Sequence, residues 1–248
     1  MRKRFAALGL ALSLLSLAAG AADLRESRKA FLRARAAMGE GNYQQALELY
    51  RKVLELVPQD AVVRFEYAQL LRDLNVADEA MKQAREVVRL DPRLVEGRRL
   101  LGGLELAAAE RDPSRLDFAI AELEEARKLA PGDPSIAAPL ARALLARGRS
   151  ADAARVLDET GDAGGHPAIV RLTAEAKAKS GRVKEAEALY RALLEANPQD
   201  RETAAALIDL YEDDDRLERA LELLQMIEKA DPENPAIPER ITLDLARA

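Results

Sequence analysis

The feature that most constrains this sequence is a repeat of about 34 residues that runs through most of the chain. Prolines recur at this distance: Pro92 lies 34 residues after Pro58, and Pro232 lies 34 residues after Pro198. A second marker, a small residue, keeps the same register. It recurs as Ala46, Ala80, Ala119, Ala153, Ala186 and Ala220. A period of this length indicates stacked copies of one supersecondary unit rather than one or two compact domains.

The composition indicates that the repeated unit is helical. The chain has 248 residues, of which 48% are hydrophobic and 33% charged, but only 4% are aromatic. Such a high charged fraction is typical of helices with a large exposed surface. Aromatic and β-branched residues are too sparse for a sandwich or barrel of many strands. We therefore expect an all-α fold.

The individual units follow a common pattern. Residues 50–58 and 190–198 both run from a tyrosine through an apolar segment to a proline, and Gly41 and Gly148 stand where a turn would join the halves of a unit. With these residues the chain resembles the tetratricopeptide repeat family, whose units are helix–turn–helix pairs of 34 residues. The resemblance implies a right-handed α-solenoid superhelix in which the first helix of each pair lines the concave face.

The resemblance covers nearly all of the region 23–234, which we divide into six predicted repeats. Their bounds are 27–60, 61–94, 95–133, 134–166, 167–200 and 201–234. Residues 235–248 are expected to form a half repeat that acts as a capping helix. Small residues midway along the first helices would allow close crossing of the paired helices. They are Ala34, Ala68, Gly102, Ala141 and Ala174.

Some units depart from the family pattern. The large aromatic residue expected early in the first helix is replaced throughout, by Ala30, Arg64, Arg98, Ala137, Val170 and Ala204. In the last unit Asp215 stands in place of the turn glycine. The third unit is five residues longer, around 110–115, which is either a turn that contacts a partner or a tolerated loop insertion. The glycine-rich link 161–167 indicates a loosened joint.

The N-terminus has the pattern of a secretory signal peptide. Basic residues at positions 2–4 precede an apolar stretch, 5–19, which ends in small residues. We expect cleavage near Ala21 or Ala22 and export to a bacterial periplasm. The alternative is an uncleaved N-terminal membrane anchor. The segment 1–22 carries three positive and no negative charges, so its removal changes the net charge from −5 to −8.

The sequence excludes most catalytic chemistry. The chain has no cysteine and a single histidine, His166, in the glycine-rich link. Disulfides, thiolate metal sites and cysteine nucleophiles are therefore excluded, and no phosphate-binding or serine-nucleophile motif is present. We expect no enzyme activity, no cofactor and no metal site. An acidic mature chain is also a poor candidate for nucleic-acid binding, and no further segment is long enough for a stable membrane span.

The first helix of each pair supplies the candidate binding residues. They are Arg28, Phe31, Arg35, Phe65, Gln69, Arg72, Arg99, Arg142 and Arg171. Further inward positions are Leu32, Met38, Val62, Glu66, Leu100, Gly103, Ala138, Leu172, Glu175, Glu202, Ala205, Asp209, Glu212 and Asp213. The predicted groove is basic and apolar at its N-terminal end and acidic at its C-terminal end. Arginine suits carboxylates, and the two phenylalanines would take an apolar side chain. Alternatively, these arginines belong to a solvated helix face and pair with nearby glutamates.

The asparagine and lysine with which the family clamps a C-terminal carboxylate are missing from the inward positions, so this activity is not expected. The sequence predicts a non-catalytic scaffold or adaptor that is exported and binds partner proteins or peptide segments, with a role in envelope assembly or secretion. The alternative is an accessory repeat region of a larger export or enzyme system whose active part lies on another chain or beyond residue 248. Fold alone does not decide between them.

Overall fold

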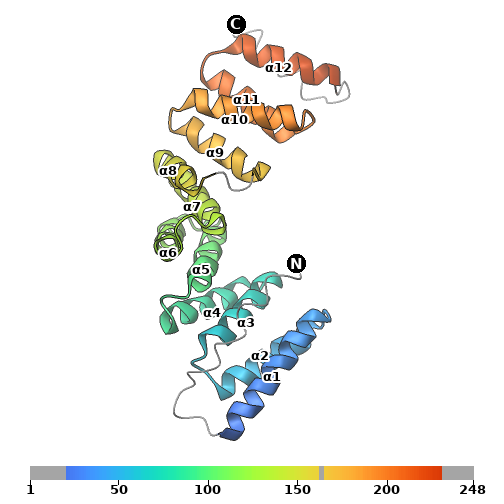
Figure 1. Ribbon diagram of the computed structural model, residues 1–248, viewed down its shortest axis with the longest axis vertical. Coiled ribbons are helices and arrows are strands. Elements are labelled where there is room, and N and C mark those ends of the chain that lie inside the picture. Colours follow the sequence, from blue (N-terminus) through green and yellow to red (C-terminus); the bar gives the residue numbers. More distant parts are fainter. Residues whose placement is uncertain (1–20, 162–164, 231–248) are drawn as a thin grey trace. The chain divides into compact units, whose positions relative to one another are not determined.

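A computed structural model describes residues 21–161 and 165–230 (Figure 1). This part of the chain contains twelve helices and no strand, which confirms the all-α helical-repeat fold. In order they are α1 (Ala21–Gly39), α2 (Tyr43–Leu56), α3 (Ala61–Asp73), α4 (Ala77–Leu90), α5 (Val95–Ala108), α6 (Arg115–Leu129), α7 (Pro134–Ala146), α8 (Ser150–Thr160), α9 (Pro167–Lys179), α10 (Val183–Ala196), α11 (Arg201–Asp213) and α12 (Leu217–Ala230).

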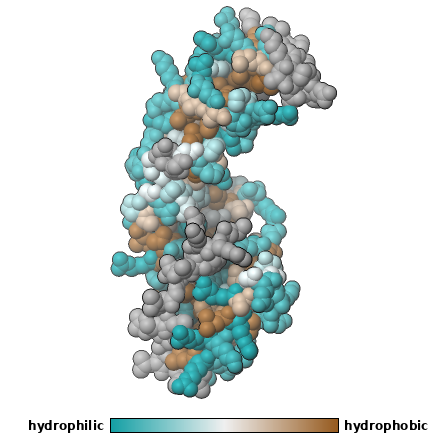
Figure 2. Space-filling model, turned by 45° about the vertical axis from the view of Figure 1, so that its right-hand side comes forward, coloured by the Kyte–Doolittle hydropathy of each residue, from teal (hydrophilic) through white to brown (hydrophobic). Residues whose placement is uncertain are grey.

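The predicted signal peptide, 1–22, lies outside the described residues except for its last two, and the predicted capping helix, 235–248, lies wholly outside them. None of the described helices is long and apolar enough to cross a membrane. On the face shown in Figure 2, hydrophilic side chains cover most of the surface, and hydrophobic ones gather in small separate areas.

The helices form successive hairpins because tight turns join them in pairs. Gly41, Gly148 and Gly181 adopt positive φ angles of 77°, 81° and 84° at these turns. In two hairpins a different residue takes this left-handed conformation: Asn75 has a φ of 59° and Asp215 a φ of 57°. Asparagine and aspartate tolerate this region better than other side chains, so the missing glycine of the last hairpin leaves the turn intact.

Close helix crossing explains the repeated small residues. All six register-marking alanines of the second helices are 0% exposed. At the facing position of the first helices, Ala34, Ala68, Ala141 and Ala174 are also 0% exposed. Gly102 takes this place on α5, where an added Cβ would lie 2.6 Å from Cγ of Leu123. The two axes of a hairpin approach closely because neither side chain extends beyond a methyl group.

The chain folds as two compact units, Met1–Ala130 and Pro131–Ala248, whose described helices are α1–α6 and α7–α12. In the first unit one hydrophobic cluster extends over α1–α5 and includes Tyr50, Leu70 and Leu71. In the second unit a cluster built from α9–α12 surrounds Tyr190 and Leu207.

Two arginines explain how the first unit replaces the missing aromatic residues. Arg64 Nη2 donates to the carbonyl oxygen of Pro58 at 2.7 Å, and its Nη1 donates to the side chain of Gln83. Arg98 Nε donates in the same way to the carbonyl oxygen of Pro92 at 2.7 Å. Each guanidinium thus joins the end of one hairpin to the next, where the family usually packs a ring.

The longer third hairpin is held to the unit by a buried carboxylate. Glu105 of α5 is only 3% exposed, and its oxygens accept from Arg85 at 2.7 Å and from Arg115 at 2.9 Å. Asp112 accepts hydrogen bonds from the backbone and hydroxyl of Ser114, so α6 begins at Arg115 rather than directly after Asp112. The inserted residues therefore place Arg115 against Glu105.

Candidate functional site

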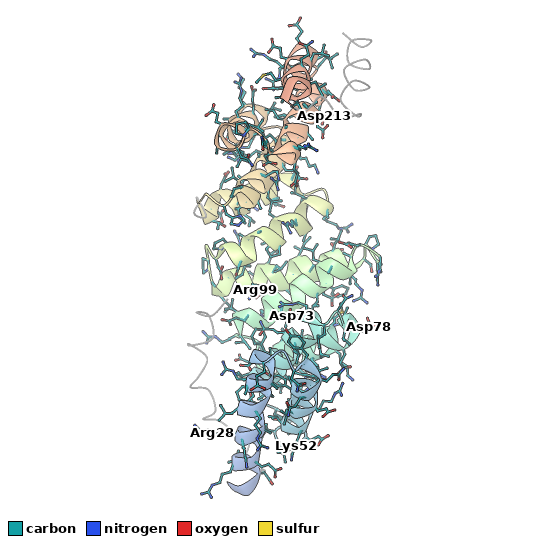
Figure 3. All side chains as sticks on the ribbon, turned by 90° about the vertical axis from the view of Figure 1, so that its right-hand side faces the viewer. Arg28, Lys52, Asp73, Asp78, Arg99 and Asp213 are labelled. Carbon is teal, nitrogen blue, oxygen red and sulfur yellow. The ribbon has the colours of Figure 1, made fainter. Side chains whose placement is uncertain are left out.

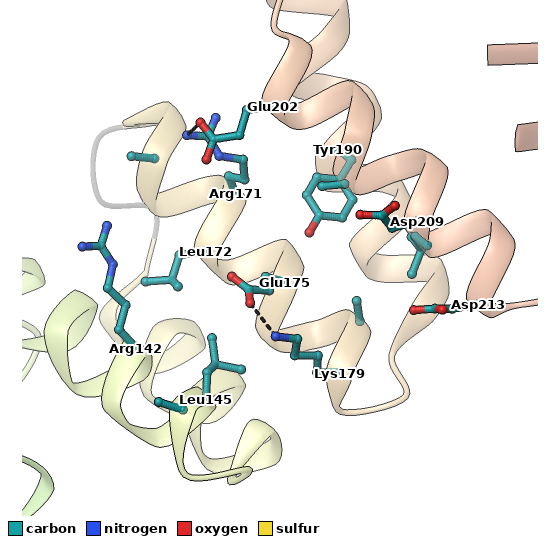
Figure 4. Close-up of a pocket in the computed structure, with 15 residues that line it drawn as sticks. Arg142, Leu145, Arg171, Leu172, Glu175, Lys179, Tyr190, Glu202, Asp209 and Asp213 are labelled. Carbon is teal, nitrogen blue, oxygen red and sulfur yellow. Dashed lines mark hydrogen bonds and ion pairs between the residues drawn. The ribbon is translucent and has the colours of Figure 1, made fainter. Parts of the chain in front are cut away.

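The first helices of the hairpins in the second unit line an open groove of about 710 Å³ (Figure 4). Its walls come from α7, α9 and α11, and α10 contributes Tyr190. Seven of its residues are among the positions expected to face inward: Arg142, Arg171, Leu172, Glu175, Glu202, Asp209 and Asp213. The structure thus brings Arg142 and Arg171 of the candidate binding residues to one site.

Apolar side chains lie between the charged ones. Leu145 and Leu172 lie near Arg142 in the close-up (Figure 4). Leu172 and Leu210 are 7% and 6% exposed, and Ala206, one helical turn before Leu210, contributes only a methyl group to the lining. Small and aliphatic side chains leave space for the side chains of a bound segment.

The charges along α9 are largely compensated within the protein. Arg171 lies 3.2 Å from Asp200 and 2.7 Å from Glu202. Lys179 lies 2.7 Å from Glu175, one helical turn earlier. Such pairs are expected of a solvated helix face. Arg171 therefore fits the second interpretation of the arginines, in which they pair with nearby carboxylates of the protein itself.

The two outer walls of the groove differ in charge. Arg142 on α7 is exposed and forms no ion pair with any residue that the structure describes. On α11, Asp209 and Asp213 place two carboxylates on the other side of the groove (Figure 4). Within this unit the groove is therefore basic toward α7 and acidic toward α11.

Tyr190 is the groove residue whose pKa is shifted from its ordinary value. Its side chain is 3% exposed, and its hydroxyl end is turned toward the space between α9 and α11 (Figure 4). Burial raises the pKa of Tyr190 to about 12; the carboxylates of Glu175 and Asp209 add to this effect, and the positive charge of Arg171 opposes it. Negative potential around a buried hydroxyl disfavours its ionised form.

The two phenylalanines of the first unit that were predicted to contact a partner are packed inside the protein. Phe31 is 7% exposed and Phe65 4%. The rings of Phe31 and Tyr50 pack edge to face, with 6.2 Å between their centres. Cζ of Arg35 lies 5.8 Å from the centre of the Phe31 ring, and Arg35 pairs with Glu66 at 3.7 Å. Little of either phenylalanine ring is therefore accessible to a partner.

The other candidate residues of the first unit are polar side chains on α1, α3 and α5 (Figure 3). Arg28 is exposed, whereas Arg99 and Gln69 are half-buried. Arg72 is exposed and forms an ion pair with its neighbour Asp73 at 2.7 Å. These residues belong to the first unit, whereas Arg142 and Arg171 belong to the second.

Sequence reasoning missed Tyr190 and Lys179 as groove residues. Tyr190 lies on α10, the second helix of its hairpin, and occupies the same place in its repeat as Tyr50. The sequence did hold a signal: the residue 16 positions after Tyr50 is Glu66, whereas the residue 16 positions after Tyr190 is Ala206. Within the described residues, no cluster of three or more histidine, cysteine, aspartate or glutamate side chains could hold a metal ion.

A second cavity of about 660 Å³ lies between α10 and α12 and is largely apolar. Its lining includes Pro198, Ala204 and Leu223. Counted from the first residue of each predicted repeat, these three residues hold the same positions as Pro58, Arg64 and Gln83. The methyl group of Ala204 therefore stands where the guanidinium of Arg64 contacts Pro58 and Gln83 in the first unit. The short side chain of Ala204 accounts for the open space.

Comparison with known proteins identifies the repeat. The sequence pattern of the tetratricopeptide repeat matches residues 37–103, 110–176 and 177–237. The chain belongs to the tetratricopeptide repeat family. A curated relative, the TPR repeat-containing thioredoxin TTL4 of Arabidopsis thaliana, is 30% identical over 95 residues. That match covers 38% of this chain but only 14% of the relative.

Several solved tetratricopeptide repeat structures have a similar fold. YrrB, described as a protein with an unusual peptide-binding site, superposes with a TM-score of 0.66 at 19% identity and covers 79% of this chain and 98% of its own. PilW, described as a type IV pilus biogenesis factor, gives 0.64 at 16% identity over 87% and 98%. Pseudomonas aeruginosa pilF gives 0.63 at 18% identity over 88% and 97%. At these identities the likeness concerns the fold alone.

Proposed function

We propose that the protein is a non-catalytic interaction module that holds an extended segment of a partner protein in the groove of the second unit. Members of this family generally mediate protein–protein interactions, and this groove combines apolar surface with charges of both signs. The observation that carries the proposal is the exposed Arg142, which has no ion pair within the described part of the chain, beside Leu145 and Leu172. A guanidinium in this setting suits a carboxylate of the partner, next to an apolar side chain.

The proposed place of action is the bacterial periplasm, in the assembly of the cell envelope. The signal-like segment 1–22 supports export, and PilW, which has a similar fold, is described as a type IV pilus biogenesis factor. Fractionation of cells that express the full chain tests it. Export predicts a shortened protein in the periplasmic fraction, and replacement of the basic residues at positions 2–4 should retain the full-length form in the cytoplasm.

Site-specific photo-crosslinking in cells tests the groove. A crosslinking amino acid at Ala146 or Ala178, which both line the groove, should yield the same specific adduct. The matched control is Ala192, an exposed alanine of α10 outside the groove lining. Two results would refute the assignment of the groove. One is an adduct of equal yield from the control position and the groove positions; the other is an adduct that persists after Arg142→Glu substitution.

A further inference from the structure

Two tyrosines at the same place in two predicted repeats have different surroundings. Counted from the first residue of each repeat, Tyr50 and Tyr190 are both at position 24. The hydroxyl of Tyr50 donates a hydrogen bond to Oε2 of Glu66 at 2.9 Å. Glu66 is at position 6 of the following repeat and is only 8% exposed. In the first unit the protein therefore supplies its own partner for the tyrosine hydroxyl.

In the second unit this internal partner is missing. Position 6 of the repeat after Tyr190 is Ala206, which lines the same groove. The Tyr190 hydroxyl forms no hydrogen bond with any residue that the structure describes, and the residue as a whole is only 3% exposed. The hydroxyl oxygen of Tyr190 is not among the fully buried atoms that lack a partner, so it reaches the groove, where a bound group can form the hydrogen bond that Glu66 forms with Tyr50. The space filled by a carboxylate in the first unit is open to the groove here.

The charges around the two tyrosines also differ in sign. In the first unit Arg35, at position 9, lies 3.7 Å from Glu66 and compensates it. The residue at position 9 of the repeat that contains Tyr190 is Glu175, and its α11 neighbours in the groove are Asp209 and Asp213. Among the described residues, Lys179 pairs with Glu175, and Arg171, the other cation near the hydroxyl, pairs with Asp200 and Glu202, so carboxylates outnumber cations around it. A negative, partly desolvated site favours a cation.

We propose that Tyr190, Glu175, Asp209 and Asp213 form a subsite for a lysine or arginine side chain of the bound segment. The oxygen of the tyrosine hydroxyl accepts a hydrogen bond from the ammonium or guanidinium group, and the carboxylates compensate its charge. The short side chain of Ala206 provides the room. This subsite rests on the proposed function, because it gives the chemistry of one residue in the segment that the groove holds.

The test is a selection from a random heptapeptide library displayed on phage, with the full chain immobilised. Peptides enriched by the wild-type protein should carry lysine or arginine more often than the starting library. Ala206→Leu fills the subsite and should return the frequency of basic residues to that of the library. Ala205→Leu is the matched control, since Ala205 is an exposed neighbour outside the groove lining, and it should keep the preference.

Measured affinities of one enriched peptide make the test quantitative. Tyr190→Phe and Asp209→Asn should each weaken binding roughly tenfold, the loss expected for one hydrogen bond to a charged group. An analogue with norleucine in place of the basic residue should bind the wild type and these variants within about twofold of one another, because it cannot use the hydroxyl or the carboxylate. Circular dichroism of each variant verifies that it is folded.

The possible outcomes separate the subsite from the groove. Enrichment without a preference for basic residues, or a preference that survives Ala206→Leu, overturns the subsite and leaves the proposed function standing. Absence of any enriched peptide overturns both. A preference that Ala206→Leu removes and Ala205→Leu retains supports the assignment.

Discussion

Among single residues, Glu66 is the buried carboxyl group whose titration should be visible in the stability of the protein. Burial raises the pKa of Glu66, although the hydrogen bond from Tyr50 and the charge of Arg35 oppose this effect. A carboxyl group with a raised pKa in the folded state stabilises the fold in its protonated form. Its contribution is therefore complete below the ordinary pKa of about 4.5 and is lost as the pH rises through the higher folded value.

The corresponding experiment compares wild type with Glu66→Gln, which cannot titrate. Urea unfolding at pH 7 and near pH 4 should show that the stability of the wild type relative to the variant increases as the pH falls. Glu48, an exposed glutamate of α2, supplies the control Glu48→Gln, which should show no such change. A difference between wild type and Glu66→Gln that shrinks on acidification would contradict the prediction.

The tyrosine pair also makes a prediction for stability. Tyr50→Phe removes a hydrogen bond to a buried carboxylate and should lower the free energy of unfolding by about 1–3 kcal/mol. Tyr190→Phe removes a hydroxyl that has no hydrogen-bond partner among the described residues, so its effect should stay within about 0.5 kcal/mol. Chemical unfolding of both variants measures the difference, and equal losses would show that the two hydroxyls have equivalent surroundings.

At the scale of helices, the close crossing of α5 and α6 can be tested with adjacent glycines. In Gly102→Ala the new Cβ would lie 2.6 Å from Cγ of Leu123, so overpacking of about 1–3 kcal/mol opposes the better helix propensity. In Gly103→Ala nothing lies within 4 Å of the new Cβ, and the variant should gain up to about 1 kcal/mol. Thermal unfolding should therefore shift in opposite directions, and two shifts of the same sign would refute the packing argument.

The link between successive hairpins leads to a further prediction for Arg98. Its guanidinium donates to the carbonyl oxygen of Pro92 and pairs with Glu122 at 2.6 Å, and both side chains are mostly buried. Arg98→Met keeps much of the packing but leaves both oxygens without this donor, so a loss of about 2–4 kcal/mol is expected. Arg93→Met, on an exposed residue of the preceding turn, should change stability by less than about 0.5 kcal/mol. Unfolding in guanidinium chloride measures both.

The helical elements were the part that sequence reasoning could predict, because the small residues repeat with the period of the hairpins. Ala34 and Ala68 were expected at crossings, and both are fully buried. What fills each space depends on side chains from two or three different helices. For this reason the burial of Phe31 against Tyr50, and the use of Arg64 in place of a ring, could not be derived from spacing within one helix. The open hydroxyl of Tyr190 likewise depends on a residue 16 positions later, Ala206.

At the scale of the whole molecule, the division into two units predicts that stability and binding can be changed separately. Within each unit, helices pack mainly against the helices that precede and follow them, so a local loss of packing has its main effect on neighbouring hairpins. Variants of the first unit, Tyr50→Phe and Gly102→Ala, should therefore lower stability while peptide affinity in the groove stays within about twofold under native conditions. Tyr190→Phe should do the reverse.

Titration of one labelled peptide into the three variants at 25 °C, together with their urea unfolding curves, tests this separation. Ionic strength provides an independent check, since the groove charges are partly exposed whereas the Gly102 contact is apolar. Raising the salt concentration from about 0.05 to 0.5 M shortens the screening length several-fold and should weaken peptide binding in all variants with an intact subsite. The stability difference between Gly102→Ala and wild type should stay constant. A first-unit variant that weakens peptide binding more than fivefold while it remains folded would mean that the two units act as one cooperative structure.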